Sequence, residues 1–369
     1  MRIGFDARMI NHPGIGRYIK SLLPEIIKQS KDDEFVLFGN PAVLEKMLPK
    51  GMGRVVKWDA PIYSVQEQLF TPYAEAKLDV LHVPHFNVPL RHKGRMVVTI
   101  HDLIYLLFPE SVPSPMARMY ASFMIGRALK KADKVISVSQ HTQEDLLRLF
   151  GKENASKIEV IHEAGGQDFH RIDDKTRIAD VRSRYRLDKN IILYVGSVKP
   201  HKNVGTLLKV FELLRLWDIP HQLVVCGRWD KKEDELKDIL KGRYIRYLGE
   251  VPSRDLAVLY SITDVLVHLS RYEGFGLTVL EAMQCGTPVV CSNISSLPEV
   301  VGDAAFMVSP DDIKNAADIV YNILMNKERS EGLVEKGIER AREFSWTKAA
   351  KETLEIYGDS GFFPDPGFK

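Results

Sequence analysis

Short, nearly unbroken apolar runs alternate with longer stretches of helical periodicity along the whole chain. The runs are rich in valine and isoleucine and seldom alternate with polar residues, which is typical of strands buried on both faces of a parallel sheet. In the first half we expect strands at residues 2–5, 34–38, 55–58, 80–83, 96–100, 135–138 and 158–161. In the second half we expect them at residues 191–195, 223–226, 245–248, 265–269, 289–291 and 304–308.

Helical patterns lie between most of these strands, for example at residues 16–29, 116–131, 142–150, 204–216 and 277–284. Two successive series of strands and helices predict an α/β protein with two doubly wound, Rossmann-like domains. A Gly-Gly pair at Gly165 and Gly166, followed by a charged stretch, places the boundary near residues 163–171. We therefore expect an N-terminal domain over residues 1–165, a C-terminal domain over residues 166–352, and a tail, 353–369, that packs back on the first domain.

Composition and charge exclude several classes of protein. Hydrophobic residues make up 45% and charged residues 27%, unlike disordered, collagen-like or coiled-coil chains. The formal net charge of +2 gives no field that favours nucleic acid. No stretch approaches the ~20 apolar residues of a membrane span, and Asp6 interrupts the apolar run that a signal peptide needs. Three cysteines do not make a disulfide framework, so we expect a cytoplasmic protein.

A glycine-containing loop follows the first expected strand. Gly14 and Gly16 lie in HPGIGRY, residues 12–18, directly before an amphipathic helical stretch. Glycines let the backbone approach an anion, and a helix N-terminus offers free N–H groups. The loop is a candidate pyrophosphate contact, although a tight turn without a ligand explains the same residues. It is neither a P-loop nor a dinucleotide fingerprint.

A histidine directly follows the fifth expected strand. His101 comes after residues 96–100 and should lie at the carboxyl edge of the sheet, where ligands of open α/β sheets bind. It is a candidate for contact with a substrate hydroxyl, and a local hydrogen bond to Asp102 is the alternative. His82 and His85 add only a loose H-x2-H spacing, so we expect no bound metal.

Basic residues gather after the first strand of the second half. The segment SVKPHKN follows Gly196 and contains Lys199, His201 and Lys202 just before a helical pattern. Positive charge beside a helix N-terminus favours an anion. We interpret this loop as a candidate phosphate site.

The most informative stretch is residues 271–302, which contain EGFGLTVLEAMQCGTPVV. Glu273 lies in a loop, and Glu281 lies roughly a turn and a half into the helix that follows. Gly274 and Gly276 lie between them. Carboxylates accept hydrogen bonds from sugar hydroxyls, while nearby amides donate to sugar or phosphate. The pattern predicts a polyol site, the alternative for Glu281 being a solvated helix residue.

These segments together resemble a known family. DARMINHPGIGRY, the HDL after the fifth strand, ISVSQHTQEDL, VGSVKPHKN, YLGEVPSRDL, the EGFG block, LPEVVGDAAFMV and FSW follow one another in the family's order. The chain is similar to the retaining glycosyltransferases of group 1, which have the GT-B fold and include bacterial glycogen synthases and lipopolysaccharide mannosyltransferases. The resemblance spans residues 1–352 and implies two Rossmann-like domains facing a central cleft.

The resemblance implies roles for matching residues. Glu273 would bind the donor sugar's hydroxyls, Lys202 would neutralise the diphosphate, and His101 would contact the sugar near the anomeric carbon. The remaining donor-binding positions that it implies are Gly14, Gly16, Ser197, Lys199, Val251, Gly274, Phe275, Gly276, Leu277 and Glu281, the last at the ribose and Val251 near the base. Many members have arginine where this chain has Ser197, so one phosphate cation is missing. Lys199 or His201 would compensate for it, or a hydrogen bond from a hydroxyl would suffice.

The implied reaction is metal-independent transfer of a hexose, with retention, from a nucleotide sugar to a glycan or lipid-linked glycan in surface polysaccharide biosynthesis. GDP-mannose is favoured as donor, with a UDP-hexose second, and no cofactor is expected. Residues 108–131 form a basic, apolar segment that we interpret as an acceptor or membrane-surface element, or as an ordinary sheet-covering helix. Two other functions remain open: a nucleotide-sugar epimerase or hydrolase, and a non-catalytic subunit that binds sugar nucleotides.

Overall fold

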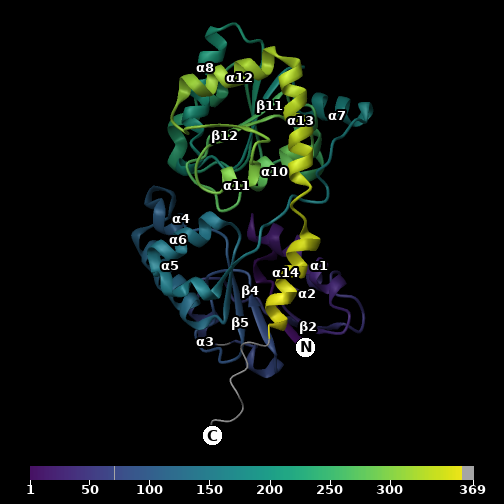
Figure 1. Ribbon diagram of the computed structural model, residues 1–369, viewed down its shortest axis with the longest axis vertical. Coiled ribbons are helices and arrows are strands. Elements are labelled where there is room, and N and C mark those ends of the chain that lie inside the picture. The colour runs from purple at the N-terminus through teal and green to yellow at the C-terminus, as the bar shows by residue number, and fades with distance from the viewer. Residues whose placement is uncertain (70, 360–369) are drawn as a thin grey trace. The chain divides into compact units, whose positions relative to one another are not determined.

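The computed structural model describes residues 1–69 and 71–359, which divide into two compact units. The N-terminal unit contains Met1–Glu163 and the segment from Ser345 onward, and the C-terminal unit contains Ala164–Phe344. Each unit has one parallel sheet flanked by helices (Figure 1). The expected boundary after residue 165 lies close to this division. The chain returns to the first unit at Ser345, earlier than expected, and residues 360–369 of the expected tail lie outside the described residues.

The N-terminal sheet has the strand order β3-β2-β1-β4-β5-β6-β7, and every pair is parallel. Its strands are β1 (Arg2–Asp6), β2 (Glu34–Gly39), β3 (Gly53–Lys57), β4 (Val80–Val83), β5 (Met96–Ile100), β6 (Lys134–Ser137) and β7 (Ile158–Val160). The central strands β4 and β5 are buried along their whole length, whereas the edge strand β3 is not. Burial on both faces explains why the central strands are continuous apolar runs.

The C-terminal sheet repeats this arrangement with the order β10-β9-β8-β11-β12-β13, again all parallel. Its strands are β8 (Ile191–Val195), β9 (Gln222–Cys226), β10 (Ile245–Gly249), β11 (Val265–His268), β12 (Val289–Ser292) and β13 (Phe306–Val308). Strand order reverses between β1 and β4 and between β8 and β11. Ligands of doubly wound sheets bind beyond the carboxyl ends of the strands at such points.

The helices lie between the strands as the apolar periodicity predicted. The N-terminal unit contains α1 (Ile15–Gln29), α2 (Pro41–Leu44), α3 (Val65–Leu69), α4 (Ile104–Leu107), α5 (Pro115–Lys131), α6 (Gln140–Phe150) and α14 (Trp346–Gly358). The C-terminal unit contains α7 (Lys175–Tyr185), α8 (Val204–Leu216), α9 (Ser253–Ser261), α10 (Leu277–Gln284), α11 (Leu297–Val301), α12 (Ile313–Met325) and α13 (Lys327–Ala341). Side-chain caps start several of them: the hydroxyls of Ser114, Ser139 and Ser345 accept from backbone N–H groups of the first turn. No helix in the described part of the chain combines the length and apolar character needed to span a bilayer.

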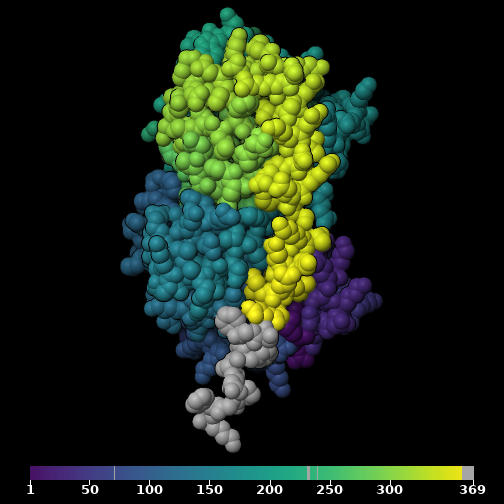
Figure 2. All heavy atoms as spheres, viewed as in Figure 1, coloured from purple at the N-terminus to yellow at the C-terminus, as the bar shows by residue number. Residues whose placement is uncertain are grey.

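Helix α14 completes the N-terminal unit. It packs against α1, and Figures 1 and 2 show it in yellow beside the purple α1. The Trp346 ring meets the edge of Tyr18 at 5.8 Å between centroids. The Tyr357 hydroxyl hydrogen-bonds Nδ1 of His82 inside the core. The end of the chain therefore supplies buried contacts to the first sheet.

Helix α5 corrects one expectation about the apolar segment 108–131. Met124 and Ile125 are buried in the core and Tyr120 is half-buried, so they do not form part of an open apolar surface. Met116, Met119 and Phe123 are exposed. Lys131, one of the basic residues of this segment, donates to two backbone carbonyls, those of Leu90 at 2.7 Å and His92 at 2.9 Å. The helix covers the sheet with one side and exposes a narrower apolar stripe on the other.

Candidate active site

Three side chains meet at the carboxyl ends of β8 and β11 in the C-terminal unit. Nζ of Lys202, in the short 3₁₀ turn Pro200–Lys202 after β8, lies 2.7 and 2.6 Å from the two carboxylate oxygens of Glu273. Nε2 of His268, the last residue of β11, lies 2.6 Å from Oε1 of Glu273. Because β8 and β11 are paired neighbours, the loops that follow them are close together. The structure thus brings together two predicted site residues, Lys202 and Glu273.

The electrostatics of this cluster keep Glu273 ionised. Burial by itself would raise the pKa of its carboxyl group, but the positive charge of Lys202 and the hydrogen bonds from His268 and Lys202 lower the pKa well below its usual range. Glu273 therefore presents a carboxylate at any working pH. A carboxylate held between two donors accepts further hydrogen bonds from hydroxyl groups through its remaining lone pairs.

Two serines fix the loop that carries Glu273. The backbone N–H of Glu273 donates to Oγ of Ser295 at 3.0 Å. The Ser296 hydroxyl lies 3.0 Å from the carbonyl of Glu273 and 2.8 Å from that of Phe275. Gly276, with φ +107°, then turns the chain into α10, a conformation that other residues rarely adopt. The predicted donor residues from Gly274 to Leu277 therefore lie on one fixed turn at the start of α10.

Glu281 is not a solvated helix residue, so that alternative is wrong. Its side chain is only 1% exposed, and Tyr260 Oη lies 3.5 Å from Oε2. A carboxylate is seldom buried without a specific reason, because desolvation is costly. The ribose contact implied for this residue remains a prediction.

The phosphate loop contains fewer cations than its sequence suggests. Burial, together with the nearby charge of Lys202, lowers the pKa of His201 to about 3, so His201 is neutral and adds no cation to this loop. The carbonyl of Ser197 accepts from the Tyr194 hydroxyl at 3.0 Å. Lys199 is half-buried beside Lys202 in the same loop. The positive charge of this loop therefore comes from its lysines. Val251, which was expected near the base, lies outside this loop and is half-buried after β10.

His268 is a site residue that the sequence reasoning missed. It is 1% exposed and stacks on Tyr194, with the rings 12° from parallel and 5.9 Å apart. Since Glu273 is ionised and accepts, Nε2 of His268 carries the proton and donates. The Nδ1 atom of His268 is buried and has no hydrogen-bond partner within the part of the chain that the structure describes. The available signal was a histidine at the carboxyl end of a buried strand, the same signal that singled out His101.

In the N-terminal unit, both ring nitrogens of His101 make hydrogen bonds. Nδ1 lies 3.0 Å from Oε1 of Glu163, and Nε2 lies 3.2 Å from the carbonyl of Pro84. The Tyr18 ring meets it edge-on at 4.8 Å. Glu163, which lies just after β7, was not predicted. These three neighbours fix the orientation of the imidazole at the carboxyl edge of the sheet.

Glycine is favoured at Gly14 and at Gly16 for two different structural reasons. Gly14 has φ +74° and open space around the position of a Cβ atom, and it caps α1. Gly16 lies inside the first turn of α1 rather than before it. A Cβ there would lie 2.4 Å from the carbonyl oxygen of Ile10, so packing alone requires glycine. The pyrophosphate contact remains a prediction for both.

His82 and His85 each bond to groups of the protein rather than to one another. His82 bonds the hydroxyls of Tyr357 and Thr99, and His85 bonds the Tyr63 hydroxyl and the backbone N–H of Asn87. Within residues 1–69 and 71–359, no group of three or more His, Cys, Asp or Glu side chains is arranged to hold a metal ion.

Comparison with known proteins decides the family. Residues 177–340 match the family described as glycosyl transferases group 1, and residues 39–164 match glycosyltransferase family 4. The chain is 30% identical to O-antigen chain mannosyltransferase B of Escherichia coli, over 97% of its own length and 99% of that protein. The chain belongs to the group 1 glycosyltransferases.

This group 1 glycosyltransferase also matches O-antigen chain mannosyltransferase RfbU of Salmonella typhimurium, with 27% identity over 73% of the chain and 71% of that protein. Among solved structures it matches Anabaena Alr3699/HepE in complex with UDP and glucose, with a TM-score of 0.73, 20% identity, and coverage of 97% and 100%. It also matches sucrose-phosphate synthase of Thermosynechococcus elongatus, with a TM-score of 0.75, 22% identity, and coverage of 97% and 98%. These neighbours confirm the predicted GT-B fold.

Proposed function

We propose that this transferase moves a hexose, with mannose favoured, from a nucleotide sugar to a glycan or lipid-linked glycan, with retention of anomeric configuration. The observation that carries the proposal is the ion pair between the half-buried Lys202 and the buried Glu273, with His268 donating to the same carboxylate. Such a cluster offers a cation for a diphosphate and a carboxylate for sugar hydroxyls. The two O-antigen mannosyltransferase relatives support surface polysaccharide as the product class.

The ion pair must exchange partners during the reaction. An arriving diphosphate attracts Lys202 away from Glu273, and the donor sugar's hydroxyls then donate to the freed carboxylate oxygen. His268 keeps its hydrogen bond to Oε1 and holds the carboxylate in place. When the bond from the anomeric carbon to the diphosphate oxygen breaks, its electron pair leaves with the diphosphate, whose growing charge Lys202 stabilises. The acceptor hydroxyl forms the new bond to the anomeric carbon, and its proton passes to the departing diphosphate oxygen. His101 is proposed to contact the sugar, and Glu281 the ribose.

GDP-mannose is the donor that we favour, with UDP-glucose as the alternative. The mannosyltransferase relatives support mannose, whereas HepE was solved with UDP and glucose and supports a UDP-hexose. Titration of both donors by calorimetry discriminates between them. Tighter binding of UDP-glucose would reverse our order.

We propose that the enzyme works in the cytoplasm, with peripheral contact to the inner membrane face where a lipid-linked acceptor would be found. All three cysteines are buried and unpaired, as is usual in a reducing compartment. The exposed stripe of Met116, Met119 and Phe123 on α5 supports the membrane contact.

The reaction itself is tested by incubating the enzyme with a panel of nucleotide sugars and measuring nucleotide release with and without acceptor glycans. We expect release to depend on an acceptor and the product to retain the donor's anomeric configuration. Equal release without acceptor would indicate an epimerase or hydrolase. Tight nucleotide-sugar binding with no turnover would indicate a non-catalytic subunit.

A further inference from the structure

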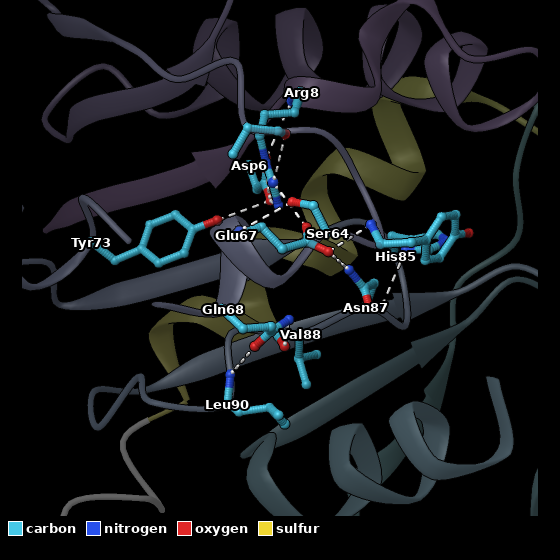
Figure 3. A network of polar contacts seen from close by, with 12 residues as sticks. Asp6, Arg8, Ser64, Glu67, Gln68, Tyr73, His85, Asn87, Val88 and Leu90 are labelled. Atoms are coloured by element: carbon cyan, nitrogen blue, oxygen red, sulfur yellow. Dashed lines mark hydrogen bonds and ion pairs between the residues drawn. The ribbon is translucent and has the colours of Figure 1, made fainter. Parts of the chain in front are cut away.

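A second set of buried polar residues lies in the N-terminal unit, beyond the carboxyl ends of β1 and β4. Arg8 lies between two carboxylates: Nη2 is 2.7 Å from Asp6 and Nη1 is 2.9 Å from Glu67 (Figure 3). Tyr73 donates to Asp6 at 2.9 Å, and Asn87 donates to Glu67. None of these residues belongs to the donor site proposed above.

This network leaves no positive charge for an anionic ligand. The Arg8 side chain is 6% exposed and faces the carboxylates of both Asp6 and Glu67. Burial opposes its charge, but the pKa of Arg8 is raised because Asp6 and Glu67 surround it. Buried ion pairs add little net stability, since desolvation offsets their attraction. Stability therefore does not explain why the network is built at the ligand edge of the sheet.

A narrow pocket opens directly on the network. Its walls include Asp6, Arg8, Pro84, His85 and Asn87, and its size suits one hydroxyl group or water rather than a whole sugar ring. Arg8 is the single side chain of fixed positive charge among the residues that line this pocket. The carbonyl of Pro84 accepts from His101, so the pocket adjoins the histidine proposed to contact the transferred sugar.

A directed chain of hydrogen bonds runs from this pocket to the surface. The backbone N–H of Asn87 donates to Nδ1 of His85 at 3.1 Å. Burial holds the pKa of His85 well below its usual range, so the ring is neutral and its proton lies on Nε2. Nε2 then donates to the Tyr63 hydroxyl at 3.1 Å. The chain therefore ends at the exposed Tyr63, and the nearby hydroxyl of Tyr105 interacts electrostatically with that of Tyr63.

The loop that carries Tyr63 is held in an unusual conformation. Tyr63 has φ 67°, which is rare for a bulky residue, and its backbone N–H donates to Glu67 at 2.6 Å. Its ring is 45% exposed and meets Tyr120 at 5.8 Å. Strain of this kind persists where the surroundings impose it, and it concentrates at ligand sites. The network thus holds an exposed aromatic ring beside a hydroxyl donor.

We propose that this surface is the subsite for a neutral sugar of the acceptor, and this rests on the proposed transferase function. The apolar face of the sugar packs on the ring of Tyr63, a hydroxyl accepts from Tyr105, and a second hydroxyl enters the pocket between Asp6 and Asn87. The neutralised Arg8 favours an uncharged hexose over a phosphate or a uronic acid. Tyr63 and Tyr105 are then determinants of acceptor specificity.

The test is saturation-transfer NMR, which measures binding of methyl α-D-mannopyranoside to the full chain in the absence of nucleotide. We expect transfer from the protein to the glycoside, and weaker transfer to the negatively charged methyl α-D-glucuronide. Tyr63→Ala should weaken mannoside binding about fivefold to tenfold, the scale of one lost aromatic contact. Tyr105→Phe should weaken it while leaving the fold intact. Tyr244→Ala, at a tyrosine 40% exposed in the C-terminal unit, is the matched control and should bind as wild type does.

Three outcomes would overturn the proposal. One is no transfer to the mannoside, another is equal binding by wild type and Tyr63→Ala, and the third is tighter binding of the glucuronide. Glu273→Gln serves as a further control, because loss of binding in that variant alone would place the glycoside in the donor site. The proposed reaction is judged separately by nucleotide release. An enzyme that binds the mannoside through Tyr63 but transfers no sugar would contradict the reaction and not the subsite.

Discussion

At the residue scale, Glu273 stays ionised because the half-buried Lys202 and the buried His268 both contact its carboxylate. Lys202→Ala removes the cation that would stabilise the leaving diphosphate, and we expect turnover to fall ~10²-fold or more. Glu273→Gln keeps the shape of the side chain but weakens its acceptance from sugar hydroxyls, so we expect a similar loss. Steady-state kinetics measures both. Lys209→Ala, at an exposed lysine of α8, is the control, and variants within about threefold of wild type, well short of that scale, would mean that the site is misplaced.

His268 acts through Glu273, so its variants should show whether the ring positions the Glu273 carboxylate or only fills space. His268→Gln keeps an amide donor near the place of Nε2, whereas His268→Leu fills similar space without a donor. We expect kcat to fall ~10-fold in His268→Leu, the scale of one hydrogen bond to a charged group, and to recover in large part in His268→Gln. Measuring kcat and KM for the donor in both variants checks this. Equal kcat values in the two variants would show that the ring serves only packing.

At the scale of elements, α14 and β4 share a buried histidine whose protonation opposes folding. Burial lowers the pKa of His82 to about 3, whereas the unfolded chain has a value of about 6.5. Below pH 6.5 the unfolded state therefore binds a proton that the folded state excludes. The contribution of neutral His82 to the free energy of unfolding is therefore fully present above pH 6.5. It is lost as the pH falls towards 3, by about 1.4 kcal/mol per pH unit.

Hydrogen exchange of peptides from β4 and α14, corrected for intrinsic rates, measures this slope between pH 7 and 5. We expect His82→Gln to be less stable at pH 7 but to have a shallower slope. His170→Gln, at an exposed histidine, should leave the slope unchanged. A slope that is identical in His82→Gln and wild type would contradict the assignment.

The exposed stripe of α5 makes the membrane proposal testable. We expect the enzyme to float with liposomes that contain anionic lipid and to detach as salt rises, because lysine and arginine near such a surface each add about 1 kcal/mol. Arg118→Glu with Lys130→Glu should abolish flotation, since both side chains are exposed. Lys131 is a poorer target because it bonds backbone carbonyls. Absence of flotation at low salt would favour a soluble acceptor.

At the scale of the whole molecule, each of the two sheets reverses its strand order once, and the charged clusters lie at these reversals. The proposed chemistry draws its positive charge from Lys202, backbone amides and the start of α8. We therefore expect activity to survive EDTA at concentrations that remove free divalent ions. Nucleotide release measured with EDTA, and again after adding Mg²⁺, checks this. Complete loss restored by Mg²⁺ would contradict it.

The sequence by itself determined the elements and the family. The thirteen strands in the part of the chain that the structure describes lie where continuous apolar runs predicted them, with ends displaced by at most two residues. Strands buried on both faces must be apolar throughout, so their pattern depends little on what they pack against. The Glu273 motif and Lys202 were recognisable for a related reason, since each follows a buried strand and precedes a helix.

Only the tertiary structure decided the partners of these side chains. His268 with Glu273, Glu163 with His101, and Arg8 with Glu67 are separated in the chain and meet because of strand order and loop path. Burial likewise decided that His201 is neutral, although its sequence neighbours suggested a cation. Local sequence carries the propensity of each element, whereas pKa values and hydrogen-bond partners depend on neighbours that only the folded chain brings into contact.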